Sequence, residues 1–124
     1  MRCLPVILIV VVVGCGQSPP ETVHGKPVSH WLDELKKPDA KVRKKAVQAL
    51  GSAASTLSEA RAGLLVGLQD AEADVRYEAC LAIVQLGAKT PAEAVPLLEK
   101  AAGDPDPRVK AAAAKALKRV QGSS

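Results

Sequence analysis

Small and apolar residues recur at helical spacing in three stretches of the chain. Each stretch begins at a valine, and these valines, Val42, Val75 and Val109, lie 33 and then 34 positions apart. Apolar or small residues follow each valine four, seven, eight and eleven positions later: Ala46, Ala49, Leu50 and Ala53; Ala79, Ala82, Ile83 and Leu86; Ala113, Ala116, Leu117 and Val120. This spacing places them on one face of a helix. The pattern therefore predicts three amphipathic helices that belong to one repeated unit.

A further helix is expected before each of these three, over about residues 28–36, 57–69 and 91–102. Helices that alternate in this way with short connections pack as hairpins, and hairpins that repeat at a constant period stack on one another. The sequence therefore predicts an all-α fold, an α-α superhelix or short solenoid of three helical hairpins over residues 28–121. Residues 122–124 are expected to form a tail.

The expected helix ends carry recognisable residues. Thr56 and Thr90 each stand three residues before a glutamate, which is the pattern of a capping box. Pro107 after Asp106 is expected to open the last helix. Three glycines are expected just past helix ends, where a left-handed conformation is common: Gly51, Gly87 and Gly122.

Two stretches of the third unit resemble the HEAT repeat. They are Pro91-Ala92-Glu93-Ala94-Val95-Pro96-Leu97-Leu98 and Asp104-Pro105-Asp106-Pro107-Arg108-Val109-Lys110. The resemblance extends to the bacterial subgroup of these repeats first noted in phycobilin lyases, and it covers about three quarters of the chain. It implies stacked hairpins whose second helices line the inner surface of the superhelix.

The resemblance also implies a ladder of charges between stacked hairpins, in which an aspartate of the inter-helix turn pairs with an arginine six residues later. Asp70 with Arg76 matches both positions of this ladder. Asp104 with Lys110 keeps the charges but loses the planar guanidinium. The first hairpin has Lys37 with Arg43 and therefore lacks the acid. A partial ladder fits terminal hairpins, which have one neighbour each.

The N-terminus has the organisation of an export signal. Arg2 supplies a positive charge, and residues 4–13 are apolar, a run too short for the roughly 20 residues of a membrane-spanning helix. Val12-Val13-Gly14-Cys15 resembles the lipobox of bacterial lipoproteins, which implies that residues 1–14 are removed and that Cys15 carries the lipid. Residues 15–27 are then expected to form a flexible tether. Gly16, where an aspartate would retain a lipoprotein at the inner membrane, mildly favours the outer membrane in double-membraned bacteria.

The composition argues against a catalytic cavity. The chain has 124 residues with no Phe, one Trp and one Tyr, so the core must be built from Ala, Leu and Val. We identify no catalytic motif, no cofactor site and no metal site, because His24 and His30 have no metal-ligand partners at useful spacing. Cys80, in the middle of a helix, is expected to be buried and inert. Trp31 is expected to cover the open end of the Ala-rich core, with ligand stacking as the alternative.

Basic residues gather on the first and last of the three repeated helices. The net charge of +4 does not by itself require a polyanion. Five lysines are candidates for contact with a partner: Lys41, Lys44, Lys45, Lys115 and Lys118. The alternative is a solvated surface that keeps an Ala-rich stack soluble, and Asp74 and Glu78 on the middle helix interrupt any continuous basic strip. Nucleic acid is disfavoured by the export signal and the scarcity of aromatic residues.

These features predict a non-enzymatic scaffold, anchored by lipid at the cell envelope outside the cytoplasm, that binds an unidentified protein. One alternative is a relative of phycobilin lyases that handles a chromophore or small ligand. The other alternative is a structural envelope protein without a discrete partner.

Overall fold

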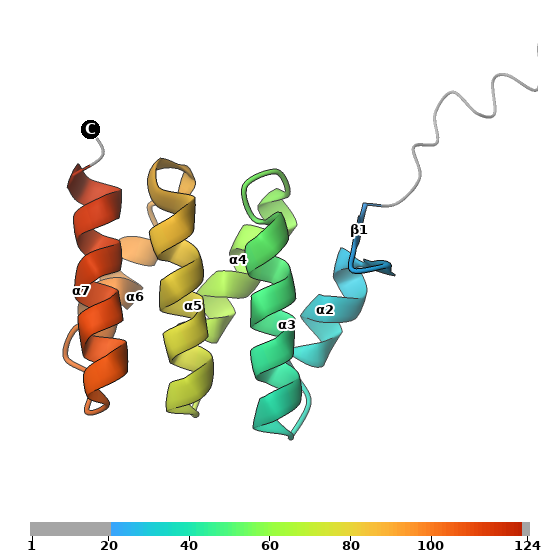
Figure 1. Cartoon of the computed structure of the whole chain (residues 1–124), viewed down its shortest axis with the longest axis horizontal. Helices are drawn as coiled ribbons and strands as arrows, with labels where there is room; N and C mark the ends of the chain where they lie inside the picture. The colour runs from blue at the N-terminus through green and yellow to red at the C-terminus, as the bar shows by residue number, and fades with distance from the viewer. Residues whose placement is uncertain (1–20, 123–124) are drawn as a thin grey trace, which may run out of the picture.

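The computed structural model describes residues 21–122, which form a row of helical hairpins (Figure 1). The three hairpins are α2 (Val28–Glu34) with α3 (Ala40–Ala53), α4 (Ser58–Gly67) with α5 (Ala73–Leu86), and α6 (Ala94–Ala101) with α7 (Pro107–Gly122). A short 3-10 helix, η1 (Gly87–Lys89), follows α5, and two short strands, β1 (Thr22–Val23) and β2 (Lys26–Pro27), precede α2. The predicted α-α superhelix of three hairpins is confirmed.

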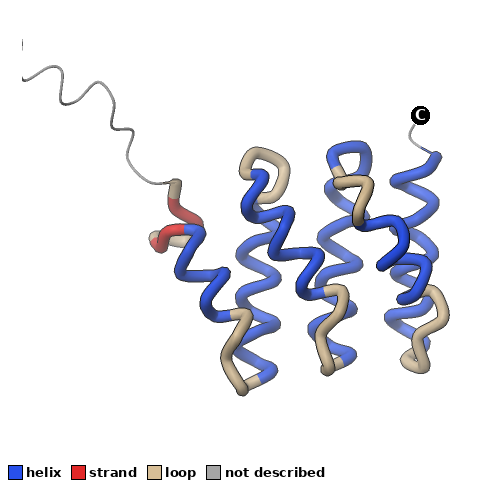
Figure 2. The backbone as a smooth tube through the Cα atoms, turned by 180° about the vertical axis from the view of Figure 1, so that it is seen from behind, coloured by secondary structure: helices blue, strands red, loops and turns tan. Residues whose placement is uncertain are grey.

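The helices lie in two layers. The longer helices α3, α5 and α7 stand side by side and run in the same direction, and the shorter helices α2, α4 and α6 cover them from behind (Figures 1 and 2). We call the side on which α3, α5 and α7 end the upper edge, and the side on which they begin the lower edge. Since α2 runs back against α3, the described chain enters near the upper edge through β1 and β2.

Small residues allow the two layers to approach closely. A Cβ atom added to Gly67 of α4 would lie 2.9 Å from Cγ2 of Val47 and 3.1 Å from Cβ of Ala79. Helix α4 therefore packs against α3 and α5 at once. Ala46, Val75, Ala79 and Val109 of the predicted apolar stripe are fully buried, whereas Val42, which begins the first stretch, is half-buried. Burial of this stripe, at about 25 cal/mol per Å² of apolar surface, is the main force that holds the hairpins together.

Gly51 does not end its helix as the sequence analysis expects. Helix α3 continues through Gly51 to Ala53, and the missing side chain at Gly51 instead makes room for α5, because a Cβ atom there would lie 2.9 Å from Cβ of Ala82. Gly122 is expected to follow the end of its helix, but it is the last residue of α7. Gly87 alone of the three expected glycines ends its helix, α5, as predicted, and has a positive φ of 55°, but its ψ of −119° lies outside the expected left-handed region.

The expected capping boxes are also absent. The Thr56 hydroxyl donates to the carbonyl oxygen of Ala53, at the end of the preceding helix. The Thr90 hydroxyl is buried without a hydrogen-bond partner among the described residues, and α6 begins only at Ala94. At the last helix the prediction is confirmed, since Oδ1 of Asp106 accepts a 2.8 Å bond from the backbone N–H of Arg108.

Residues 22–27, expected to belong to the tether, form a small antiparallel hairpin. Its two turn residues, His24 and Gly25, have φ angles of 52° and 78°, which matches the type I′ turn that two-residue hairpins prefer. The hairpin is held on α2 by Trp31, whose Nε1 donates to the carbonyl oxygen of Val23 at 2.9 Å. Trp31 is buried, as predicted, and closes this end of the stack together with the hairpin.

The export signal, the lipobox with Cys15 and the final two residues lie outside the described residues. Within residues 21–122, no helix is long and apolar enough to cross a membrane.

Candidate interaction surface

Two bidentate ion pairs connect successive hairpins along the lower edge. Arg43 of α3 donates from Nε and Nη2 to the carboxylate of Asp70 at 2.8 and 3.1 Å. Arg76 of α5 repeats this contact with Asp104 at 2.7 and 3.1 Å. Parallel paired bonds of this kind combine charge with fixed geometry. Each arginine therefore ties its own hairpin to the hairpin that follows.

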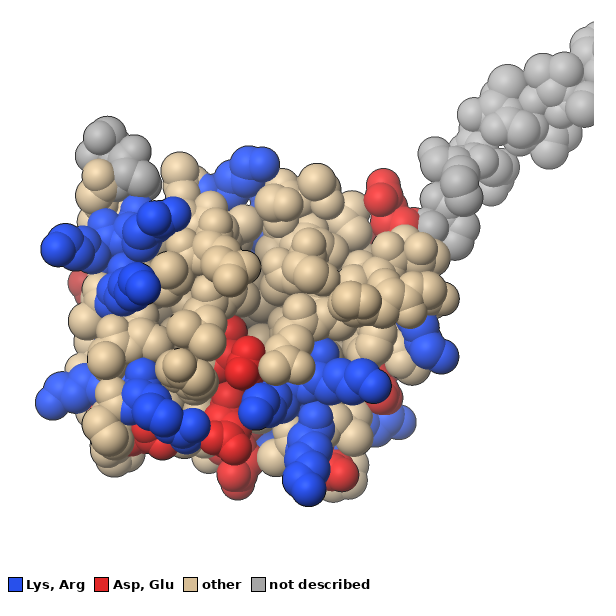
Figure 3. Space-filling view, viewed as in Figure 1, with Lys and Arg blue, Asp and Glu red and all other residues tan. Residues whose placement is uncertain are grey.

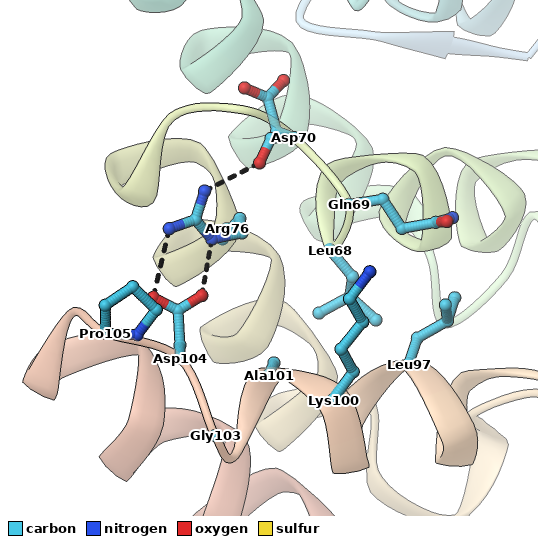
Figure 4. Close-up of a pocket in the computed structure, with 10 residues that line it drawn as sticks. All are labelled: Leu68, Gln69, Asp70, Arg76, Leu97, Lys100, Ala101, Gly103, Asp104 and Pro105. Carbon is cyan, nitrogen blue, oxygen red and sulfur yellow. Dashed lines mark hydrogen bonds and ion pairs between the residues drawn. The ribbon is translucent and has the colours of Figure 1, made fainter.

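The third nitrogen of each guanidinium binds the turn of its own hairpin. Nη1 of Arg76 donates to the carbonyl oxygens of Asp70 and Ala71 at 2.8 and 3.0 Å, and the first of these bonds is drawn in Figure 4. Nη1 of Arg43 does the same with the carbonyls of Lys37 and Pro38. The arginine thus bridges two turns.

The ladder therefore differs from the pairing implied by the resemblance. Asp70 and Arg76 are both members, but the carboxylate of Asp70 is held by Arg43 of the preceding hairpin, and Arg76 touches only its backbone oxygen. Asp104 likewise pairs with Arg76 and not with Lys110, whose side chain has no ion pair within residues 21–122. Arg43 was missed as a member because the sequence analysis paired each arginine with the acid of its own turn. The sequence does hold a signal for this pairing, because an acid, Asp70, lies in the turn of the next repeat, 27 positions after Arg43.

The ladder is partly shielded from water. The side chains of Arg76 and Asp104 are 17% and 8% exposed. The hydrogen bond from Arg76 lowers the pKa of Asp104 and raises that of Arg76, and the bond to Asp70 raises the pKa of Arg43. The groups are therefore held charged and paired, which suits a structural role and leaves no free acid or base.

A hollow of about 350 Å³ lies beside the ladder, between the ends of α4 and α6 (Figure 4). Leu68 and Leu97 supply its apolar wall, and Lys100 is the lining ionisable side chain that has no ion pair there. A general acid–base pair needs two groups with pKa values set apart from each other. Because Asp70 and Asp104 are both held by arginines, this hollow offers no such pair.

The five candidate lysines form two separate groups on the exposed face of the longer helices. The α3 cluster, Lys41, Lys44 and Lys45, lies toward the lower edge, where α3 begins. Lys115 and Lys118 lie near the end of α7 and are joined there by Arg119, which completes the α7 cluster. Figure 3 shows basic side chains gathered on the flanking helices, with acidic ones between them. The structure does not join them into one strip.

A pair that the sequence analysis missed lies between the two clusters. Arg108 at the start of α7 donates to Asp74 of α5 at 2.8 Å and to Asp106 at 3.1 Å, with its guanidinium 5.3 Å from the centre of the Tyr77 ring. The hydrogen bond from Arg108 lowers the pKa of Asp74. Asp74 is thus paired with Arg108 and also feels the charge of Lys44, whereas neither cluster has an ion pair within residues 21–122.

Cys80 is fully buried on α5, as predicted, and burial raises the pKa of its thiol to about 11. Since the thiolate is the nucleophile, we expect iodoacetamide at pH 8 to leave Cys80 unmodified in the folded protein and to alkylate it in denaturant. Mass spectrometry of the peptide that contains Cys80 measures this difference. Equal alkylation with and without denaturant would show that the thiol is accessible.

The described residues hold no group of three His, Cys, Asp or Glu side chains that could bind a metal ion. His24 and His30 instead pack edge-on against the Trp31 ring, with centroids 6.2 and 4.9 Å away. Both histidines therefore lie at the closed end of the stack.

Comparison with known proteins agrees with this architecture. The family model described as HEAT repeats matches residues 28–118, from the start of α2 into α7, which is more than half of the chain. The comparison with curated proteins gives no match. The repeated hairpins, the bridging arginines and the family match lead to one assignment: the chain belongs to the HEAT-repeat family.

Proposed function

We propose that this protein is a lipid-anchored scaffold of the bacterial cell envelope, and that its α3 cluster binds an acidic segment of a partner protein. HEAT repeats generally serve as scaffolds for protein–protein interaction and are typically not catalytic. The protein surface and the membrane anchor are two separate parts of the proposal, and each has its own support.

The observation that carries the protein-binding part is the unpaired charge of the α3 cluster. Lys41, Lys44 and Lys45 lie within five positions of one helix and have no ion pair among the described residues. The neighbouring acid Asp74 is held by Arg108. A partner carboxylate therefore meets lysines without having to displace an existing bond. Such surfaces favour acidic partners through electrostatic steering.

The anchor part rests on the lipobox-like Val12-Val13-Gly14-Cys15 at the end of an apolar leader. A diacylglyceryl group on Cys15 would hold the folded stack at a membrane surface outside the cytoplasm. The outer membrane is the favoured site in a double-membraned bacterium, because Gly16 follows the cysteine. The mass of the mature N-terminal peptide tests this anchor directly.

The protein-binding part is tested by crosslinking in cells followed by affinity capture. We expect wild type to capture a reproducible protein partner and Lys41→Glu/Lys44→Glu/Lys45→Glu to lose it, because the charge that attracts the partner is reversed. The variant Lys115→Glu/Lys118→Glu/Arg119→Glu is the matched control, with the same change in net charge on α7. An identical catch from all three proteins would exclude the α3 cluster as the binding surface.

A further inference from the structure

We propose that the α7 cluster docks on anionic phospholipid headgroups and thereby orients the stack on the membrane. The inference rests on the lipid anchor at Cys15 proposed above and adds the surface that faces the bilayer. Its starting point is a hollow of about 710 Å³ at the upper edge, lined by Lys115, Lys118, Arg119 and the short stretch from Leu86 to Ala88.

The hollow combines an apolar floor with cations that form no ion pair among residues 21–122. Leu86 and Ala88 supply the floor, and the three basic side chains are exposed around it. No aspartate or glutamate occurs in α7 or between residues 81 and 90, and none of the three cations has an ion pair within residues 21–122. Headgroup phosphates supply the missing negative charge.

Helix electrostatics explain only part of this arrangement. Cations in the last turn of a helix are stabilised by the negative end of its dipole, and Arg119 lies in the last turn of α7. Lys115 lies about two turns before the end at Gly122, where this effect has faded. All three basic side chains line the hollow, but the helix dipole accounts for the position of Arg119 alone.

The position of the anchor favours a lipid surface as the occupant. The chain enters near the upper edge, the edge at which α7 also ends, but it enters beside α2, at the opposite end of the row from α7 (Figure 1). Six peptide steps separate Cys15 from Glu21, and an extended chain of that length spans at most about 20 Å. Lipid on Cys15 thus keeps the entry end of the upper edge close to the headgroups, and the α7 cluster at the other end reaches them when the whole upper edge lies along the membrane.

Docking of the upper edge has a consequence for the proposed partner site. The α3 cluster lies toward the opposite, lower edge, where α3 begins. With the α7 cluster on the headgroups, the lysines of the α3 cluster point away from the membrane and stay accessible. The two basic clusters then have different ligands: phospholipid for the α7 cluster and protein for the α3 cluster.

A fluorescent reporter tests the orientation on vesicles. The mature protein is purified from membranes, labelled at Gly122→Cys and reconstituted into vesicles that carry a headgroup quencher. Gly122 lines the hollow, and an added side chain there meets no atom within 4 Å. We expect the label to lose fluorescence on phosphatidylglycerol-containing vesicles but not on phosphatidylcholine alone, and high salt to reverse the loss. A label at Ala71→Cys, at the lower edge, is the control and should stay bright.

Charge reversal separates this inference from the anchor. Lys115→Glu/Lys118→Glu/Arg119→Glu should abolish quenching at Gly122→Cys, whereas the matched Lys41→Glu/Lys44→Glu/Lys45→Glu should leave it unchanged. Protein that floats with both kinds of vesicle while the label stays bright would keep the anchor and overturn the docking. If the purified protein carried no lipid on Cys15 and still floated with anionic vesicles, and the α7 variant did not, the proposed anchor would be wrong and the docking would be supported. If the α7 variant lost a protein partner in the affinity capture, and phosphatidylglycerol did not change the fluorescence of the label, the α7 cluster would be a protein-binding surface.

Discussion

Gly51→Leu should lower the free energy of unfolding by about 3 kcal/mol, although leucine is a far better helix former than glycine. Gly51 lies inside α3 with its Cα facing α5, and a Cβ atom there would approach Cβ of Ala82 to 2.9 Å. Ala82 cannot rotate its methyl group away, because that carbon is fixed to the backbone of α5. The two helices must therefore separate, and the whole α3–α5 interface loses contact.

Urea unfolding of the purified mature protein measures this effect, with Gly122→Leu as the matched control. Gly122 is also helical, but an added side chain meets nothing within 4 Å. The control should be nearly unchanged, because Gly122 is the last residue of α7, where the cost of glycine in a helix interior applies only in part. If both variants unfolded at the same urea concentration, the close approach at Gly51 would not limit the packing.

Asp104→Ala should lower the free energy of unfolding by about 2 kcal/mol, because the Arg76 guanidinium loses two of its acceptors in a partly buried position. Lys110→Ala is the control and should change stability by less than about 0.5 kcal/mol, since its side chain has no ion pair within residues 21–122. The double variant Arg76→Ala/Asp104→Ala should be less destabilised than the sum of the two single variants. Additive effects would mean that the pair contributes no coupling.

The contribution of Asp104 should also depend on pH. Arg76 lowers the pKa of Asp104 below its ordinary value, which is near 3.9 in an unfolded chain. The stabilisation is therefore fully present above the unfolded pKa and is lost as pH falls through the lower, folded pKa. The difference in stability between wild type and Asp104→Ala should be constant from pH 6 to pH 7 and shrink below about pH 4. A difference that stayed constant into strong acid would contradict a charged pair.

The ladder also affects how the stack ends. Each arginine reaches forward to an acid of the next hairpin, so the last member of the series, Lys110, has no following hairpin to bind within residues 21–122. At the other end, the first turn carries Lys37 where the later turns carry Asp70 and Asp104. Copies stacked end to end would bring Lys37 toward Lys110. This arrangement of charge disfavours extension of the stack by a second copy.

The repeat itself could be predicted from the chain alone. The stripe that begins at Val42, Val75 and Val109 has a helical period, and that period follows from the order of apolar and polar residues without reference to any neighbour. The burial of Cys80 and the cap at Asp106 were predictable for the same reason, because both depend on residues a few positions away. The two basic clusters were also visible as residue types on two helices.

Tertiary packing decided the features that depend on residues far apart in the chain. Gly51 has the sequence context of a helix end, but the approach of Ala82, 31 positions away, makes it an interior contact residue. Asp70 has a suitable arginine on either side, and the stacking of hairpins selects Arg43.

The amino-acid sequence by itself determined the period, the helix faces and the positions of charge, because these are local properties of the chain. Only the tertiary structure decided which charges meet. It also decided that residues 22–27 fold onto Trp31. Pairing depends on the distance between hairpins, and that distance is set by how closely the small residues allow the helices to pack.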